Sequence, residues 1–296
     1  MTGCADGDKI VAMRIKRLIK DMTPDSVVQI RKWRKAHGVF PRIFRPVTFS
    51  EKVLHRNLFE RRDEFKQIAD KAAVRSYVER RLGPEILPKL FHLTGAPDTI
   101  PFDELPSKFV VKPTHGSGWV RVVTDKSTLD RPALIATCAD WLKRSYYRES
   151  REIVYKGVEP RILVEEFIDD GGATPNDYKL FVFGGSVEYI QADLNRFDHH
   201  KQLLYSPAWK KLDVRYVGDD ISGEVERPPH LREMIEAAEM LGRDWDFIRA
   251  DFYDTAGRLY FGEITLTPNE GCVRFRPQEF DDYLGSLWKV HERTDR

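Results

Sequence analysis

The sequence predicts an α+β fold with a helical N-terminal region, and three observations support this class. Apolar residues recur at helical spacing as far as Gly83-Pro84. From Leu87 the chain changes to short β-rich runs separated by Pro, Gly and Asp. Turns at Gly184-Gly185 and at residues 254–257 are typical of hairpins. The strands are therefore expected to pair antiparallel.

The composition is that of a globular chain. Its 296 residues are 41% apolar and 32% charged, with a formal net charge of +1, which is enough for about two domains. A net charge so close to zero argues against a dedicated nucleic-acid binder. Three scattered cysteines form no paired-thiol motif, and without a secretory signal they indicate a reducing cytoplasm. No apolar run is long enough to span a membrane.

Residues 1–85 form the predicted helical region. Between residues 9 and 35, apolar positions at helical spacing alternate with basic ones and are interrupted near Pro24, which indicates two helices. The first fifty residues hold 11 Lys and Arg against 4 Asp. These helices could contact an anionic membrane from its inner face, or they could simply present a solvated face.

A further helix is expected to start at residues 48–51 with Ser50 as its cap, and helical character continues from Lys71 to Arg81. Later helices are predicted over residues 132–146 and 229–241. The expected strands are residues 109–112, 120–123, 162–165, 179–183 and 187–190.

Residues 247–271, FIRADFYDTAGRLYFGEITLTPNEG, predict a hairpin with acids on one face. A three-residue loop would pair Asp254 with Arg258, and so set Asp251 opposite Phe261 and Arg249 opposite Glu263. Asp251 and Glu263 would then be diagonal neighbours whose carboxylates can converge on a metal ion. The other face is expected to be core: Ile248, Ala250, Phe252, Tyr260, Gly262, Ile264 and Leu266. An ordinary half-exposed hairpin with solvated acids is the alternative.

The run KFVVKPTHGSGWVRVV, residues 108–123, places Lys112 at the end of a buried strand, before a loop with Gly116 and Gly118. Such a loop can close over phosphates, with Lys112 and backbone N–H groups facing the anionic oxygens. It lacks the ending of a Walker loop, and two glycines can also serve turn geometry alone.

Two more segments could carry chemistry. RILVEEFIDD, residues 161–170, ends a strand where backbone groups could meet a purine edge, with Asp169 or Asp170 near the ribose. In the hairpin of residues 176–197, Lys179 and Arg196 could stabilise charge on a transferring phosphoryl group. The alternatives are a solvated strand end and surface salt bridges.

Together these segments follow a known order: a DK pair at Asp70-Lys71, the strand, lysine and glycine loop, EEFI, DYK, and the carboxylates of RADF and GEIT. Over about Phe49 to Gly271 this order resembles the ATP-grasp superfamily, most closely its TupA-like branch, which is associated with teichuronopeptide and other surface polysaccharide biosynthesis. The resemblance implies two α+β subdomains that grip ATP. They are a small lid subdomain, residues 86–168, and a C-terminal subdomain with the metal site, residues 169–296.

The resemblance also implies roles for individual residues. ATP binding is implied for Lys71 and Lys112 at the phosphates, for the loop residues His115, Gly116, Ser117 and Gly118, and for Glu165, Glu166, Phe167, Ile168 and Asp169 at adenine and ribose. Lys179 and Arg196 are the implied catalytic cations. Asp251 and Glu263 are the implied ligands of two Mg²⁺ ions, with Thr265 and Asn269 as further ligands.

One position departs from many superfamily members. They carry an asparagine two residues after the second glutamate, where this chain has Thr265. A threonine hydroxyl can still coordinate magnesium, Asn269 lies nearby in the sequence, and the TupA-like branch shares the Glu-Ile-Thr form.

The leading hypothesis is a cytoplasmic, ATP- and Mg²⁺-dependent carboxylate–amine ligase that forms an acyl-phosphate and modifies a cell-surface polysaccharide precursor. Its partner would be a small-molecule or glycan-precursor acceptor. Two alternatives stay open: a phosphotransferase acting on a sugar hydroxyl, and a nucleotide-binding scaffold in which Thr265 marks lost catalysis.

Overall fold

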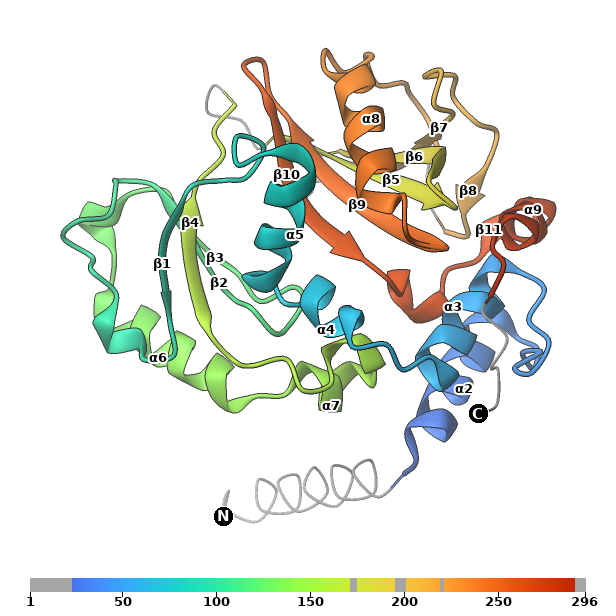
Figure 1. Cartoon of the computed structure of the whole chain (residues 1–296), viewed down its shortest axis with the longest axis horizontal. Helices are drawn as coiled ribbons and strands as arrows, with labels where there is room; N and C mark the ends of the chain where they lie inside the picture. Colours follow the sequence, from blue (N-terminus) through green and yellow to red (C-terminus); the bar gives the residue numbers. More distant parts are fainter. Residues whose placement is uncertain (1–22, 171–174, 195–200, 219–220, 291–296) are drawn as a thin grey trace, which may run out of the picture.

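The computed structural model describes residues 23–170, 175–194, 201–218 and 221–290. Within them, two antiparallel sheets are packed with helices, and the helical N-terminal region lies beside the second sheet (Figure 1). This content confirms the predicted α+β class. No helix in these ranges is both long and apolar enough to cross a membrane. The first predicted N-terminal helix lies outside the described residues.

The helices are α2 (Asp25–His37), α3 (Phe49–Phe59), α4 (Glu64–Ala69), α5 (Ala73–Leu82), α6 (Arg131–Lys143), α7 (Tyr146–Ser150), α8 (Leu231–Gly242) and α9 (Glu279–Leu287). Short 3-10 turns are η1 (Pro97–Thr99), η2 (Lys126–Thr128), η3 (Ile153–Tyr155) and η4 (Pro268–Gly271). The helix predicted over residues 132–146 is therefore two, because the chain is extended at Arg144 and Ser145 caps a new start at α7.

The cap of α3 differs from the predicted one. Thr48 Oγ1 accepts the N–H of Glu51 at 3.1 Å, and Glu51 Oε2 accepts the N–H of Thr48 at 3.3 Å. This is a capping box, so the N-cap is Thr48 and not Ser50. Ser50 instead donates its N–H to Asp281 Oδ1 of α9 at 2.9 Å, which ties the two helices together.

The first sheet contains β1 (Leu90–Thr94), β2 (Phe109–Pro113), β3 (Arg121–Val123) and β4 (Ile162–Glu166) in the order β1-β4-β2-β3. Helix α6 packs against β2 and closes a small hydrophobic core that contains Phe109, Leu134 and Ile162.

The second sheet contains β5 (Asn176–Phe183), β6 (Ser186–Leu194), β7 (Lys201–Tyr205), β9 (Phe247–Asp254) and β10 (Leu259–Thr265) in the order β10-β9-β5-β6-β7. A separate pair is formed by β8 (Arg215–Tyr216) and β11 (Phe275–Arg276). The hairpin predicted at Gly184-Gly185 is confirmed, with φ angles of 54° and 87° that favour glycine. The subdomain boundaries at residues 85 and 168 stay predictions.

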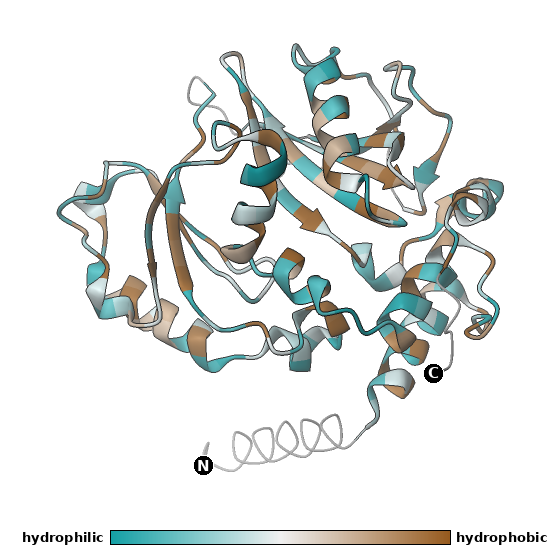
Figure 2. Ribbon diagram, viewed as in Figure 1, coloured by the Kyte–Doolittle hydropathy of each residue, from teal (hydrophilic) through white to brown (hydrophobic). Residues whose placement is uncertain are grey.

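The two faces of the second sheet differ. One face packs against α8, α4 and α5 in the largest hydrophobic cluster, and hydrophobic residues run along the strands of both sheets (Figure 2). The other face is aromatic at one end of its strands and polar further along. Phe181, Phe183 and Phe247 pack against α3 and α9 at the aromatic end. Lys179 and Asp251, which pair with each other on β5 and β9, lie on the same face in the polar part. The polar site therefore starts where an aromatic core ends.

The register of the β9–β10 hairpin differs from the predicted one. Thr255 closes the turn by donating its N–H to the Arg258 carbonyl at 3.2 Å, so Asp254 pairs with Leu259 and not with Arg258. A bulge then falls between Phe261 and Glu263. As a result Asp251 lies directly opposite Glu263, whereas the sequence predicted a diagonal pair.

The same change of register places two aromatic residues on the faces opposite to those predicted. Phe261, predicted on the acidic face, is 2% exposed and belongs to the largest hydrophobic cluster. Tyr260, predicted in the core, pairs with Tyr253 and directs its hydroxyl to Glu166 Oε1 at 3.4 Å. The other residues predicted for the core face, apart from Gly262 at the bulge, are buried there: Ile248, Ala250, Phe252, Ile264 and Leu266.

Gly262 makes the bulge possible, because a Cβ atom there would lie 3.0 Å from the Asp251 carbonyl oxygen and 3.3 Å from the Tyr253 ring. We predict that Gly262→Ala lowers the free energy of unfolding by about 1–3 kcal/mol, since β9 and β10 must move apart. Thermal denaturation measures the change.

Gly257→Ala is the matched control, because nothing lies within 4 Å of a Cβ atom at that turn glycine. We expect it to change stability by less than about 0.5 kcal/mol. Equal melting temperatures for Gly262→Ala and the unchanged protein would contradict a tightly packed bulge.

Candidate functional site

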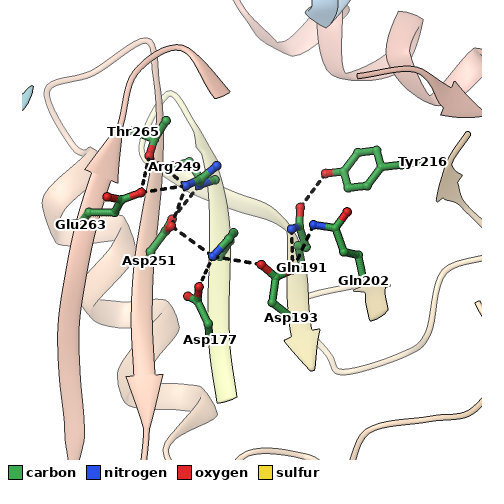
Figure 3. Close-up of polar contacts among 10 residues, drawn as sticks. Asp177, Gln191, Asp193, Gln202, Tyr216, Arg249, Asp251, Glu263 and Thr265 are labelled. Atoms are coloured by element: carbon green, nitrogen blue, oxygen red, sulfur yellow. Dashed lines mark hydrogen bonds and ion pairs between the residues drawn. The ribbon is translucent and has the colours of Figure 1, made fainter. Parts of the chain in front are cut away.

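The centre of the candidate site is the opposed pair Asp251 and Glu263, joined by Arg249 (Figure 3). Arg249 donates Nε to Asp251 Oδ1 at 2.7 Å and Nη2 to Asp251 Oδ2 at 2.6 Å. The same Nη2 lies 3.2 Å from Glu263 Oε1 and 2.9 Å from Thr265 Oγ1. One planar guanidinium therefore fixes the orientation of both carboxylates and of the threonine hydroxyl.

Lys179 lies on the neighbouring strand β5, directly opposite Asp251 of β9. Its ammonium contacts Asp177, Asp193 Oδ2 at 3.2 Å and Asp251 Oδ2 at 3.4 Å. The residue is 6% exposed. Gln191 and Gln202 donate to Asp193 Oδ1, and Gln191 accepts from the Tyr216 hydroxyl (Figure 3). The predicted catalytic lysine is thus enclosed by three carboxylates.

These side chains carry more negative than positive charge. Four carboxylates (Asp177, Asp193, Asp251 and Glu263) surround two cations, Lys179 and Arg249. Such a surplus attracts a cation, and Mg²⁺ commonly binds through one or two carboxylates together with substrate phosphates. In the described part of the chain, no three His, Cys, Asp or Glu side chains are arranged to hold a metal ion by themselves. The two opposed acids fit the magnesium mode.

Burial and neighbouring charges act differently on the two acids. Burial raises the pKa of Asp251, against the attraction of Arg249 and Lys179. Burial opposes ionisation of Glu263 as well, but the charges of Lys71 and Arg249 outweigh it and lower the pKa of Glu263. Burial also opposes the charges of Lys179 and Arg249, but Asp251 raises the pKa of both. Glu263 is therefore the more readily ionised acid, and it is also the more open one, with 37% of its side chain exposed.

A narrow pocket between the two sheets brings together residues that are far apart in the sequence. Lys71 lines it from the turn between α4 and α5, Lys112 and Glu165 line it from the first sheet, and Glu263 lines it from β10. Lys112 forms an ion pair with Glu165, while Lys71 donates to the Gly116 carbonyl. Burial lowers the pKa of Lys71. Both lysines predicted to bind phosphate thus line the same pocket as Glu263, one member of the acid pair.

The glycine loop between β2 and β3 is packed by aromatic residues. His115 Nε2 donates toward the carbonyls of Trp141 at 3.1 Å and Arg144 at 3.2 Å, so its ring serves the loop's own structure. A Cβ atom at Gly116 would lie 3.0 Å from the Trp119 ring, and Gly118 has a φ of 74°. Phosphate binding by this loop stays a prediction, and its backbone N–H groups and Ser117 are the groups that would bind phosphate.

The predicted adenine hinge begins within the last two residues of β4, Glu165 and Glu166, and continues beyond the strand. Glu166 exchanges hydrogen bonds with the backbone of Lys89, as acceptor through its side chain and as donor through its N–H, both at 2.9 Å. Phe167 lies under the ammonium of Lys108, 5.7 Å from the ring centroid, and Lys108 also pairs with Asp169. Ile168 is half-buried. Adenine binding by these residues stays a prediction.

Thr265 is the last residue of β10, and Asn269 follows that strand in η4. Thr265 lies 3.3 Å from Glu263 Oε1, so its hydroxyl is within the acid cluster. Asn269 is exposed in η4, where it and Glu270 have φ angles of 49° and 56°, a left-handed geometry that is rare outside glycine. Arg196 lies outside the described residues.

The sequence did not lead us to three residues that support the predicted site residues. Arg249 was given no role, although its two-residue spacing from Asp251 on a strand places both on one face. The same alternation could have identified Asp177 beside Lys179. Glu152 gave no sequence signal, because its partner Thr267 is 115 residues away.

Glu152 lies beneath the η4 turn and is 7% exposed. Its Oε2 accepts the Thr267 hydroxyl at 2.7 Å. On the same turn, Glu270 pairs with Lys32 of α2 at 2.7 Å. Burial, reinforced by the charge of Glu270, raises the pKa of Glu152 to about 7. The turn that follows the acid pair is thus supported by a carboxyl group that prefers to be protonated.

Comparisons with known proteins bear on this site. A family model described as TupA-like ATPgrasp matches residues 51–289. No curated protein matches the chain.

Several solved structures resemble the chain. They include D-alanine–D-alanine ligase from Bacillus anthracis (19% identity, 75% of this chain and 64% of that one, TM-score 0.47) and the same enzyme from Helicobacter pylori (18%, 75% and 61%, 0.43). The ATP-grasp ligase PsnB complexed with minimal precursor is another (12%, 76% and 62%, 0.44). The chain spans 61 to 64% of the lengths of these three.

Glu152 predicts a pH dependence of stability. At low pH both the folded and the unfolded state hold its proton; between pH 4.5 and about 7 only the folded state does, so the free energy of unfolding falls as pH rises. The expected loss is roughly 3 kcal/mol at about 1.4 kcal/mol per pH unit. Glu152→Gln should remove this loss, since glutamine stays neutral and can accept from Thr267.

Urea denaturation at pH 5 and pH 8 measures the effect in both proteins. Glu159→Gln is the control, because its side chain is 77% exposed, and it should leave the pH dependence unchanged. If Glu152→Gln lost as much stability between the two pH values as the unchanged protein, the protonated state of Glu152 would be refuted.

Proposed function

The chain belongs to the TupA-like ATP-grasp family, and from this premise we propose that it is an ATP- and Mg²⁺-dependent carboxylate–amine ligase. The observation that carries the proposal is the pocket between the sheets, where Lys71 and Lys112 face Glu263. Cations at one wall and a carboxylate at the other suit a triphosphate and its metal ion.

The proposed reaction has two steps. An oxygen of the substrate carboxylate attacks the γ-phosphorus of ATP, the bond to the β-phosphate oxygen breaks, and ADP leaves. The amine nitrogen of the second substrate then attacks the acyl carbon, phosphate leaves, and the amine proton passes to solvent. No covalent bond to the protein is needed, so positioning and electrostatics supply the rate enhancement.

Each group has a proposed part. Lys71 and Lys112 would bind phosphate oxygens, and the loop of residues 115–118 would close over them. Asp251 and Glu263 would hold two Mg²⁺ ions, with oxygen donors from Thr265 and Asn269, and the ions would neutralise phosphate charge. Residues 165–169 would bind adenosine.

Lys179 and Arg196 would stabilise the negative charge near the transferred phosphoryl group. Lys179 already contacts Asp251 Oδ2 at 3.4 Å, so it would also hold that carboxylate in place. Arg249 would do the same for both acids through its bonds to Asp251 and Glu263.

We further propose that the acceptor is a cell-surface polysaccharide or its precursor. The family resemblance seen in the sequence supports this choice of acceptor. Purified protein with ATP, Mg²⁺ and mixed amino acids or uronic acids should release ADP, and mass spectrometry of the product should find an amide. A phosphorylated sugar in place of an amide would identify a phosphotransferase, and ATP binding without ADP release would identify a scaffold.

Glu263→Gln should reduce ADP release by roughly 100-fold or more, because it removes one of the two acids proposed to bind Mg²⁺. Glu263 suits this test better than Asp251, whose 5% exposed side chain is bonded to two cations that a substitution would leave partly unpaired. Circular dichroism should find the fold retained.

Glu236→Gln on α8 is the control, because its side chain is 56% exposed in an ion pair with Arg232 away from the pocket. It should keep full activity. A Glu263→Gln variant that releases ADP at the normal rate would refute the proposed metal site.

A further inference from the structure

The loop between α2 and α3, residues 38–48, exposes an unusual amount of apolar surface at the edge of the molecule beside α3 and α9 (Figure 1). Among the described residues, ten large apolar side chains are exposed, and four of them lie in this loop: Val39 (61%), Phe40 (68%), Phe44 (79%) and Val47 (47%). Single exposed apolar residues are ordinary on protein surfaces. A cluster within nine residues indicates a binding surface.

The loop is held firmly in this exposed position. The buried carboxylate of Glu51 accepts the N–H groups of Arg42 and Val47 at 2.9 Å and also the Arg42 guanidinium at 2.9 and 3.0 Å. At the base of the loop, α9 approaches so closely that a Cβ atom on Gly285 would clash with the Val47 carbonyl. The middle of the loop at Arg42 and its C-terminal end at Val47 are therefore held. Phe44 contacts the Phe59 ring of α3 at 5.9 Å between centroids and stays largely exposed.

Exposed basic side chains lie on the loop and on the part of α2 that leads into it. Arg31, Arg34, Lys35 and Arg45 are exposed, and the Arg34 guanidinium lies 4.3 Å from the centroid of the Phe40 ring. The acidic groups near the loop's Arg42 are Glu51, Asp281 and Asp282. Of these, Glu51 is bonded to Arg42 and Asp281 to Ser50, so Asp282 alone is an exposed acid facing this arginine.

Exposed aromatic side chains among arginines and lysines match the interface of an anionic membrane, where rings enter the headgroup region and cations meet lipid phosphates. We propose that residues 38–48 dock the protein on an anionic lipid bilayer through Phe40 and Phe44. This surface is separate from the nucleotide pocket and does not depend on the proposed reaction.

The test is sedimentation of the full chain with vesicles of phosphatidylcholine alone or of phosphatidylcholine with phosphatidylglycerol. We expect binding to the anionic vesicles, weaker binding in high salt, and a loss of roughly tenfold or more in partitioning for Phe40→Ser/Phe44→Ser. This variant leaves the basic residues ahead of Thr23 unchanged, so it separates the loop from that segment.

Val217→Ser/Met240→Ser is the matched control, because these side chains are 45% and 46% exposed elsewhere on the surface. It should bind vesicles like the unchanged protein, and all variants should keep the same melting temperature. The proposal is overturned if the unchanged protein does not bind anionic vesicles, if Phe40→Ser/Phe44→Ser binds them normally, or if the control variant loses binding equally. The proposal is also overturned if Phe40→Ser/Phe44→Ser still binds anionic vesicles but no longer binds a soluble acidic protein that the unchanged protein binds.

Discussion

The bulge at Gly262 is the constraint on which the site depends. Side chains of a strand alternate between its two faces, so one extra residue in β10 changes the face of everything after it. Before the bulge Phe261 belongs to the core; after it Glu263 faces the site opposite Asp251. Without that extra residue the second acid would point into the hydrophobic cluster. Glycine suits this position, because a Cβ atom would lie only 3.0 Å from the Asp251 carbonyl oxygen.

Arg249 and Lys179 then decide how the acids behave. Burying a carboxylate without a cation is costly, and pairing offsets that cost without leaving much net stability. What the ion pairs provide is geometry, because Arg249 bonds both oxygens of Asp251 and reaches Glu263 with the same nitrogen. Glu263 is the more readily ionised of the two acids, because the charges of Lys71 and Arg249 lower its pKa. A metal ion would therefore meet an ordered pair of ligands and not two mobile side chains.

The features that could be predicted from the sequence are those set by local residue patterns. Alternation on β9, the glycine pair at residues 184 and 185 and the order of motifs led to the fold class, the strands and the acid pair. The exact register could not be predicted, because Thr255 closes the turn one residue later than the Asp-to-Gly pattern suggests. An isolated glycine in a strand is a signal for a bulge that could have been used at Gly262. Glu152 could not be found, since only the folded chain brings it to Thr267.

The N-terminal helices are part of the site's framework and not an appendage. The η4 turn holds Asn269 and Glu270 in left-handed conformations that persist only when surrounding contacts impose them. Those contacts come from α2, through Lys32 to Glu270 and His37 Nε2 to the Gly271 carbonyl at 2.9 Å, and from α3, whose backbone leaves no room for a side chain at Gly271. The first turn of α3 also contains Glu51, which fixes the exposed loop of residues 38–48. The first turn of α3 thus contacts both the exposed loop of residues 38–48, through Glu51, and the η4 turn, through the Ser50 carbonyl beside Gly271.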